Sequence, residues 1–292
     1  MTRQPLRLAI AEGERVLADA GVSSPRVDAE LLAAHVLGIE RTKLPMIPLV
    51  DPPVVDALGK LIAARASRIP LQHLTGWAAV GATTVAVGPG VFVPRPETEI
   101  LLQWAVEQIQ QRDAPLVVDL CSGSGAIALA LANVRPDAVV YAVEQDQVAL
   151  SWLRRNADAH VEAGNTRVHL VAGDVGDHDL LTELDGLVDL ITCNPPYVPA
   201  DTAVPPEVAE HDPPQAVFGG ADGLAVIRPL IGCVARLLRP GGVLAIEHDE
   251  EQSDAVTALL RGRRVLEEVD DHRDLAGRPR FATARRAEAA RG

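Results

Sequence analysis

The sequence has few cysteines: Cys121, Cys193 and Cys233 are the three in 292 residues. Their odd number and wide separation exclude a disulfide framework and a CxxC metal motif. Long hydrophobic runs are also missing, since no stretch of 18 apolar residues and no basic-then-apolar leader occurs. We therefore expect neither a membrane span nor a secretory signal. These absences favour a reducing, cytoplasmic location without a membrane partner.

Aromatic residues are scarce as well, at 3%, although hydrophobic residues make up 48% of the chain and the mean hydropathy is +0.12. The core must therefore be built mainly from Ala, Val and Leu. A chain of this length is expected to form one large domain or two modest ones.

Basic residues are in deficit, and the net charge is −13 at pH 7. Residues 1–85 carry nine basic and eight acidic side chains, whereas the remainder carries 18 basic and 32 acidic ones. A protein that binds duplex DNA normally presents a basic face to the phosphates. The acidic excess therefore argues against a direct nucleic-acid substrate, with a local basic patch as the alternative.

Two regions with different periodicity precede residue 96. Apolar residues recur at helical spacing between residues 5 and 70, which predicts a small helical bundle over residues 1–76. The bundle has two candidate roles, packing and the docking of a partner. Residues 72–95 alternate apolar residues with Gly and Thr, which predicts a β-hairpin that links two domains, assigned to residues 77–95.

From residue 96 onward, strand-like and helix-like segments alternate. This alternation indicates an α/β domain with a mainly parallel sheet that helices cover on both faces, assigned to residues 96–285. The last segment, 286–292, is predicted to be a disordered tail. The strand candidates are Leu116–Leu120, Val139–Val143, Val168–Val171, Val188–Cys193 and Val243–Glu247.

The stretch VVDLCSGSGAIALALA, residues 117–132, is typical of a strand, a glycine-containing turn and a helix. Gly123 and Gly125 lack a Cβ atom, so the backbone can turn tightly and approach a ligand closely. A nucleotide-type ligand then lies over the exposed N–H groups of the first helical turn. The turn is weak evidence by itself, because it matches neither a P-loop nor GxGxxG.

Three further residues extend this predicted site. Glu144 ends the next strand about 20 residues beyond the turn, where a carboxylate accepts hydrogen bonds from both ribose hydroxyls and disfavours NADP. After the third strand, Asp174 is expected to accept from an adenine amine and Val175 to cover the ring, although Gly-Asp is also ordinary turn chemistry. These features predict an adenosine-bearing cofactor and leave NAD and S-adenosylmethionine open.

The stretch TCNPPYVP, residues 192–199, follows the fourth strand, and its consecutive prolines fix the backbone. The Asn194 side-chain oxygen and the Pro195 carbonyl are two neutral acceptors, suited to an NH2 group on a planar system. Tyr197 can lie against that plane, which leaves the nitrogen lone pair aimed at an electrophilic methyl group. We therefore predict Asn194, Pro195 and Tyr197 as catalytic residues, with Pro196 completing the substrate-binding loop and no metal required.

Three residues near these motifs have competing interpretations. Cys193 is adjacent to Asn194 in a strand, so the two side chains point to opposite faces and Cys193 is expected in the core rather than in the site. Arg95 and Glu97 either border the active site or form an ion pair at the linker.

The motif set resembles class I S-adenosylmethionine methyltransferases that act on planar amines. More narrowly, it resembles the HemK/PrmC family, the peptide chain release factor glutamine methyltransferases. The combination of PRPETE with FGGxDGL is more specific than NPPY alone, and the matching stretches follow the family's order over nearly the full chain. They are PLQHLTG at 70–76, FVPRPETEIL at 92–101, DLCSGSGAIALALA at 119–132, DLITCNPPYV at 189–198, AVFGGADGL at 216–224 and LRPGGVLAIEH at 238–248.

The resemblance implies a helical amino-terminal domain that docks the release factor, a hairpin linker, and a Rossmann-like seven-stranded sheet with one antiparallel strand. It implies methyl transfer from S-adenosylmethionine to the glutamine amide nitrogen in the GGQ loop of class I bacterial release factors, which modulates translation termination. S-adenosylhomocysteine is then the product. The residues expected to bind the cofactor are Cys121, Ser122, Gly123, Ser124, Gly125, Glu144, Asp174, Val175 and Asn194.

Three residues depart from the family pattern. Cys121 replaces the customary first glycine, and Glu144 replaces the commoner aspartate. Asp249 stands where EHG would have glycine, and the sequence offers no explanation for it.

Three rival functions share parts of these motifs. A nucleic-acid adenine methyltransferase would use the same NPPY loop on a flipped base. A glutamine methyltransferase of a ribosomal protein would keep the chemistry and change the substrate. A non-catalytic cofactor-binding scaffold is the third, although such a module would not require the NPPY loop.

Overall fold

The computed structural model describes residues 3–288, and the chain folds into two compact units with separate hydrophobic cores. The sequence-based boundaries divided the chain into consecutive segments. In the structure, by contrast, a segment from the middle of the chain folds with the amino-terminal residues. The first unit comprises Met1–Trp77 and Val204–His211, and the second comprises Ala78–Ala203 and Asp212–Gly292.

The first unit is helical, as the apolar periodicity predicted. Its longest helices pack around a core in which Leu17, Ala29 and Leu32 are fully buried. The sequence did not predict the two-residue strands β1 (Gln4–Pro5) and β2 (Leu49–Val50), which pair antiparallel. The helices are α1 (Leu6–Asp19), α2 (Pro25–Leu37), η1 (Arg41–Met46), α3 (Pro52–Ala66), α4 (Leu71–Thr75) and α8 (Pro206–His211).

A buried charge network joins α8 to α3 within this unit. Glu207 accepts hydrogen bonds from Arg65 at 2.9 Å and from Arg68 at 2.5 Å. Arg65 is buried and also donates to Asp28 at 2.7 Å. Burial opposes ionisation of Glu207, but the hydrogen bonds from the two arginines hold its pKa below the ordinary value. The segment that follows the NPPY loop is therefore fixed to α3 by paired charges.

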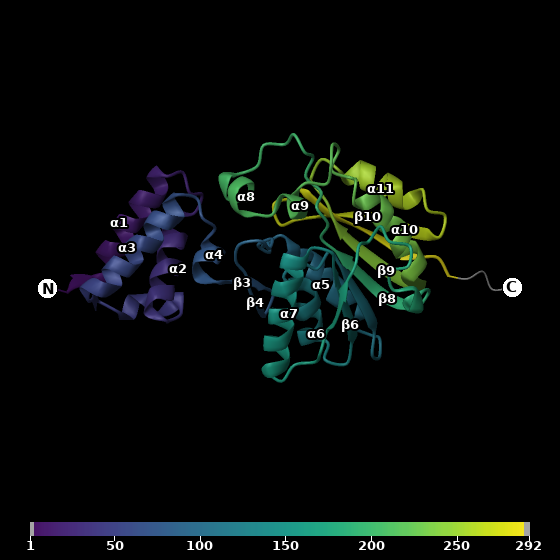
Figure 1. The fold of residues 1–292 in the computed structure, drawn as a ribbon, viewed down its shortest axis with the longest axis horizontal. Coiled ribbons are helices and arrows are strands. Elements are labelled where there is room, and N and C mark those ends of the chain that lie inside the picture. Colours follow the sequence, from purple (N-terminus) through teal and green to yellow (C-terminus); the bar gives the residue numbers. More distant parts are fainter. Residues whose placement is uncertain (1–2, 289–292) are drawn as a thin grey trace. The chain divides into compact units, whose positions relative to one another are not determined.

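The second unit contains a seven-stranded sheet in the order β10-β11-β9-β8-β5-β6-β7 (Figure 1). Strand β11 is antiparallel to both of its neighbours, and the pairs among β5, β6, β7, β8 and β9 are parallel. The mostly parallel sheet with one antiparallel strand is thus confirmed. The strands are β5 (Leu116–Leu120), β6 (Val139–Glu144), β7 (His169–Ala172), β8 (Val188–Cys193), β9 (Leu238–Glu247), β10 (Leu266–Arg273) and β11 (Pro279–Arg286).

All five strands predicted from the sequence are present, and β5 and β8 have the predicted bounds. The strands of this sheet that were not predicted are β10 and β11. Strand β10, LEEVDDHR, lies at the edge of the sheet, so most of its side chains are at least partly exposed and it lacks the apolar run of a central strand. At the predicted tail, Arg286 ends β11 and Ala287 donates its N–H to Val265 O, whereas residues 289–292 lie outside the described part.

Helices cover both faces of the sheet, as Figure 1 shows. Val117 of β5 packs in one core cluster with α5, α6 and α7, and its neighbour Val118 packs in another with α10 and α11. Successive strand residues point to opposite faces, which explains the division. The remaining elements are β3 (Trp77–Val80), β4 (Thr83–Ala86), α5 (Thr98–Ile109), α6 (Ala126–Val134), α7 (Gln147–Glu162), η2 (Thr182–Leu184), α9 (Pro214–Val217), α10 (Ile227–Leu237) and α11 (Ser253–Arg261).

Strands β3 and β4 form a separate two-stranded sheet within the predicted hairpin region, and Val85 of β4 packs in the same core cluster as α6. Between residues 3 and 288, none of the helices has the length and apolar character needed to cross a bilayer.

The loop after β8 packs directly on the glycine-rich loop 218–224. Gly219 donates its N–H to Val198 O at 2.9 Å, and Gln252 donates its side-chain N–H to Tyr197 O at 2.8 Å. A Cβ atom at Gly219 would overlap Pro196 O, and one at Gly223 would overlap Tyr197 O. Glycine at these positions therefore lets the two backbones approach closely, which is the physical reason for the FGGADGL motif.

Arg65→Met tests the charge network of the first unit. The substitution keeps much of the apolar stem but leaves Asp28 and part of the Glu207 carboxylate without a cation. We expect the unfolding free energy to fall by about 3–5 kcal/mol, the usual effect of breaking a buried ion pair. Arg15→Met is the matched control because its pair with Asp19 is exposed, and it should change stability by less than about 1 kcal/mol. Equal effects in chemical denaturation would contradict the assignment.

Gly223→Ala tests the close packing of the two loops. Gly223 and Gly186 both have left-handed backbones, with φ of +73° and +70°, but a Cβ at Gly186 has open space around it. In both alanine variants, strain in the left-handed backbone lowers the unfolding free energy by about 1–2 kcal/mol. We expect Gly223→Ala to lose about 1–3 kcal/mol more, because its Cβ must displace the Tyr197 carbonyl. Calorimetric melting of the two variants measures the difference, and equal losses would show that the close approach is unimportant.

Candidate functional site

A cavity lies at the carboxyl ends of β5, β6 and β8 in the second unit. Parallel strands place their carboxyl ends at one edge of the sheet, where open α/β folds bind ligands. The lining residues come from the turn after β5 (Cys121, Ser122, Gly123, Ser124), the start of α6 (Ala126, Ile127), the end of β6 (Val143–Asp146), Ala149 of α7, the loop after β7 (Gly173, Val175), the loop after β8 (Asn194, Pro196), and two covering segments (Gly90–Phe92, Pro94 and Thr98; Pro213, Gln215 and Ala216).

The turn after β5 has left-handed backbones at Cys121, Gly123 and Gly125, with φ of +58°, +56° and +85°. A non-glycine residue in this region costs about 1–2 kcal/mol, which explains why glycine is customary where this chain has Cys121. Gly123 lines the cavity, and a Cβ there would meet open space. Gly125 is not among the lining residues: its missing Cβ makes room for Leu153 of α7. The two glycines therefore have different roles.

Glu144 holds the glycine turn against the end of β6. Its carboxylate is buried and accepts one hydrogen bond from the Gly123 N–H and one from the Asp146 N–H, each at 2.8 Å. Burial raises the pKa of Glu144 despite these bonds. Each carboxylate oxygen keeps a further lone pair, so the side chain can still accept from ligand hydroxyls.

The loop after β7 separates the two residues predicted there. Val175 is buried and lines the cavity, whereas Asp174 is not among the lining residues and accepts a hydrogen bond from the Gly176 N–H at 2.8 Å. The sequence did not single out Asp146, whose carboxylate caps the amino terminus of α7 and accepts from Gln215 Nε2 at 3.2 Å. The sequence signal that could have identified Asp146 was an acidic residue immediately before a helix.

The loop after β8 brings two of its four predicted residues to the cavity. Asn194 and Pro196 line it, and Pro195 and Tyr197 are not among the lining residues. Asn194 Nδ2 donates to Thr98 Oγ1 at 3.4 Å. The Tyr197 hydroxyl donates to a buried carboxylate, Glu247 Oε1, at 3.0 Å. Burial, with the adjacent Glu247 carboxylate, raises the pKa of Tyr197 well above its ordinary value.

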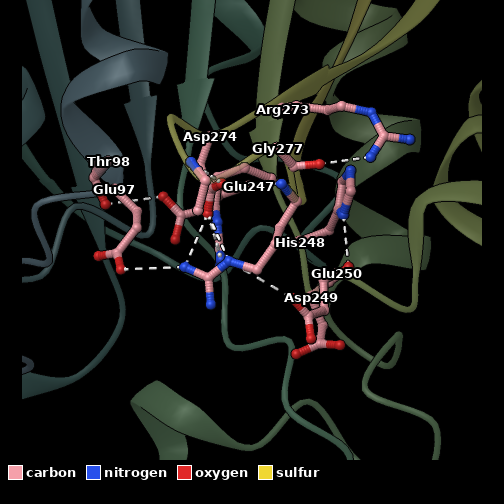
Figure 2. Close-up of polar contacts among 12 residues, drawn as sticks. Glu97, Thr98, Glu247, His248, Asp249, Glu250, Arg273, Asp274 and Gly277 are labelled. Atoms are coloured by element: carbon pink, nitrogen blue, oxygen red, sulfur yellow. Dashed lines mark hydrogen bonds and ion pairs between the residues drawn. The ribbon is translucent and has the colours of Figure 1, made fainter.

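The sequence-based prediction missed three buried polar residues at this edge of the sheet. Thr98 and Glu247 contact the NPPY loop, and Thr98 Oγ1 donates to Glu247 Oε2 at 2.9 Å (Figure 2). Asp119 near the end of β5 accepts from the Thr192 hydroxyl at 2.7 Å, and burial raises its pKa to about 7. The sequence signal that could have identified Asp119 and Glu247 was an acid within an apolar strand, as in LVVDL and VLAIE. Such an acid is buried only where it has hydrogen-bond partners.

Asp212 joins the two covering segments of the cavity. Its carboxylate accepts from the Val93 N–H at 3.3 Å and forms an ion pair with Arg95, whose guanidinium lies 4.9 Å from the ring centroid of Phe92. Arg95 thus forms an ion pair next to residues that line the cavity. Glu97 forms a longer ion pair of 3.9 Å with Arg278.

The structure also accounts for Asp249, the unexplained departure. Its φ lies outside the left-handed region, so the backbone does not require glycine there. The Asp249 N–H donates to Gln252 Oε1 at 3.0 Å, and its carboxylate accepts from the Glu251 N–H at 3.0 Å. Asp249 therefore helps to orient Gln252, which binds the Tyr197 carbonyl.

Two protein-family profiles match this chain. Residues 9–76 match the PrmC N-terminal domain, and residues 83–211 match the methyltransferase small domain. Solved structures with similar folds include a 16S rRNA N2 G1207 methyltransferase from T. thermophilus in complex with AdoMet and guanosine (TM-score 0.50, 21% identity, 72% of this chain and 49% of that one). A methyltransferase from Pyrococcus furiosus is similar at TM-score 0.50 and 19% identity over 70% of this chain and 89% of that one. These likenesses support the Rossmann-like methyltransferase fold.

Curated relatives match over nearly the whole chain. The release factor glutamine methyltransferase of Mycolicibacterium smegmatis is 53% identical over 98% of this chain and 99% of that protein. The proteins of the same name from Mycobacterium tuberculosis and Streptomyces coelicolor are each 47% identical, over 96% and 95% of this chain and 91% and 97% of their own lengths. On this identity and coverage, the chain belongs to the family of release factor glutamine methyltransferases.

Proposed function

We propose that this protein transfers a methyl group from S-adenosylmethionine to the side-chain amide nitrogen of the glutamine in the GGQ loop of bacterial class I peptide chain release factors. S-adenosylhomocysteine is the second product. The observation that carries the proposal is the shared cavity: the glycine turn, Glu144 and Asn194 all line it. A cofactor bound at the carboxyl ends of β5 and β6 can therefore contact a substrate amide bound at the loop after β8.

The lining residues fit an adenosine-bearing cofactor. Gly123 leaves open space beside the turn, and the Glu144 carboxylate can accept from ribose hydroxyls. Val175 supplies an apolar surface for a flat ring. The Ser124 hydroxyl is buried without a hydrogen-bond partner and is available to a polar ligand group. When bound, S-adenosylmethionine supplies a methyl group on a positively charged sulfur that leaves as a neutral thioether.

The residues of the NPPY loop act by positioning. An amide nitrogen is a poor nucleophile because its lone pair is delocalised into the carbonyl. We propose that the Asn194 side-chain oxygen and the Pro195 carbonyl accept hydrogen bonds from the two N–H groups of the substrate amide. These two bonds orient the amide nitrogen. Alignment of this kind lowers a barrier by about 7–11 kcal/mol in favourable cases. The proton released after transfer goes to water.

The helical unit is proposed as the docking site for the release factor, because residues 9–76 match a domain that accompanies this catalytic domain in the family. Release factors act on ribosomes, so a cytoplasmic location follows from the proposal. The net charge of −13 disfavours the rival nucleic-acid substrate.

Incubation with labelled S-adenosylmethionine tests the substrate class. The acceptors are a purified bacterial release factor, its GGQ-to-GGA variant, a ribosomal protein fraction and duplex DNA. We expect label only in the release factor that retains the glutamine. Label in DNA or in the ribosomal proteins would show that the proposed substrate is wrong.

Asn194→Ala tests the role of the loop. Without the side-chain acceptor, the substrate nitrogen loses its alignment, and we expect kcat to fall by at least about 100-fold. The dissociation constant for S-adenosylmethionine, measured by calorimetry, should change far less, because Asn194 forms only a small part of the cavity lining. Near-normal turnover in this variant would refute the mechanism.

Glu144→Gln tests the cofactor site. The substitution removes the charge and leaves either Gly123 or Asp146 without an acceptor for its N–H. A hydrogen bond to a charged group contributes about 1.5–3 kcal/mol, so we expect S-adenosylmethionine to bind about 10–100-fold more weakly. Glu267→Gln, at an exposed position of β10, is the control and should bind normally. Equal affinities in the two variants would exclude Glu144 from the cofactor site.

A further inference from the structure

Four polar side chains beside the cavity form a branched set of hydrogen bonds. Asn194 Nδ2 donates to Thr98 Oγ1 at 3.4 Å, and Thr98 Oγ1 donates to Glu247 Oε2 at 2.9 Å. The Tyr197 hydroxyl donates to Glu247 Oε1 at 3.0 Å. We call the first branch, from Asn194 through Thr98 to Glu247, the amide chain. The Glu247 carboxylate is therefore the common acceptor at the end of both branches.

The direction of the amide chain is set by Glu247. An ionised carboxylate has only acceptor sites, so the Thr98 hydroxyl must give its one proton to it. Thr98 Oγ1 can then offer only a lone pair to Asn194, and it is the NH2 end of the Asn194 amide that must face it. Because the amide is planar, its oxygen diverges from the nitrogen and points away from Thr98. Asn194 lines the cavity, so this oxygen is the end available to a ligand there.

The surroundings of Glu247 indicate a role beyond packing. The residue is 1% exposed at the end of β9, and Thr98 is 2% exposed at the start of α5. A buried carboxylate is costly, and an apolar residue of similar volume at such a position is often neutral or stabilising. Burial raises the pKa of Glu247, whereas the hydrogen bonds from Thr98 and Tyr197 and the nearby charge of Arg280 favour its ionised form. The Arg280 guanidinium itself hydrogen-bonds Asp274. An acid held here by two hydroxyl groups is thus a poor choice for stability alone.

We propose that Glu247, acting through Thr98, is a positioning residue that fixes the Asn194 amide with its oxygen toward the substrate. The site thereby selects a side chain that ends in NH2 and rejects one that ends in a carboxylate. This inference rests on the proposed function, because it explains how the enzyme distinguishes glutamine from glutamate. A glutamate side chain would bring a second acceptor against the Asn194 oxygen and leave both unpaired.

Thr98→Val is the direct test, since valine keeps the shape and removes the hydroxyl. The Asn194 amide then loses the partner that holds its NH2 end, and both orientations become accessible. We expect kcat for the release factor to fall by about 10–100-fold, with the dissociation constant for S-adenosylmethionine little changed. The melting temperature should fall as well, because one buried oxygen of Glu247 loses its donor. Thr98→Ser retains the hydroxyl and should restore most of the rate. Thr283→Val removes another buried hydroxyl, on β11, and is the control with a normal rate.

The second readout is selectivity, which a purely structural defect would not alter. A release factor whose GGQ glutamine is replaced by glutamate serves as a competitor of methyl transfer. Wild-type enzyme should bind it about tenfold more weakly than the glutamine form, the equivalent of about one hydrogen bond. In Thr98→Val this ratio should fall toward one. Glu247→Gln provides an independent variant: its amide can donate to Thr98 and reverse the chain, so the ratio should fall there too.

The outcomes separate the two proposals. If wild-type enzyme transfers no methyl group to the release factor, the proposed function is wrong. If wild-type enzyme is active and Thr98→Val and Glu247→Gln keep its rate and its glutamine-to-glutamate ratio, the amide chain has no such role. Loss of rate with an unchanged ratio would also overturn the inference, because it would mark the two residues as structural only.

Discussion

The proposed catalytic edge of the sheet depends on the fixed shape of one short loop, the NPPY segment after β8. Two prolines restrict its backbone, but they do not orient the amide of Asn194 or the ring of Tyr197. Those side chains are oriented from outside the loop, by Thr98 and Glu247. The loop backbone is held separately by Gln252 and by two glycines that permit close contact. Rigidity here is therefore supplied by β9, α5 and the glycine-rich loop together.

Buried acids are the second common feature of this edge. Asp119, Glu144 and Glu247 lie at or near the carboxyl ends of β5, β6 and β9, and burial raises the pKa of each. Glu144 accepts from the Gly123 N–H of the glycine turn, and Glu247 accepts from the Tyr197 hydroxyl of the NPPY loop. Asp119 accepts from the Thr192 hydroxyl near the end of β8. Burying these three carboxyl groups lowers the stability of the fold at the edge of the sheet where the loops are held. Such local losses of stability are common at functional sites.

Local patterns in the sequence were sufficient for much of the fold. The central strands are continuous apolar runs because both faces of the sheet are buried, and such runs have clear boundaries. The edge strand β10 was missed for the converse reason: its exposed side chains are mostly charged. The glycine turn, Glu144 and the NPPY loop were recognisable because each needs particular residue types at one place. Asp174 illustrates the limit, since Gly-Asp fits both a ligand contact and the turn that the structure contains.

Local residue patterns were enough to predict the α/β class, the parallel strands and, through a set of motifs in order, the family. The folding of Val204–His211 with the amino-terminal helices depends instead on long-range contacts, because Glu207 in this segment pairs with arginines more than 130 positions away. Long-range contacts likewise place Glu247 against Thr98, 149 positions away, and Thr98 against Asn194. Contacts at such separations arise from strand order and helix packing, which no local pattern of residues encodes.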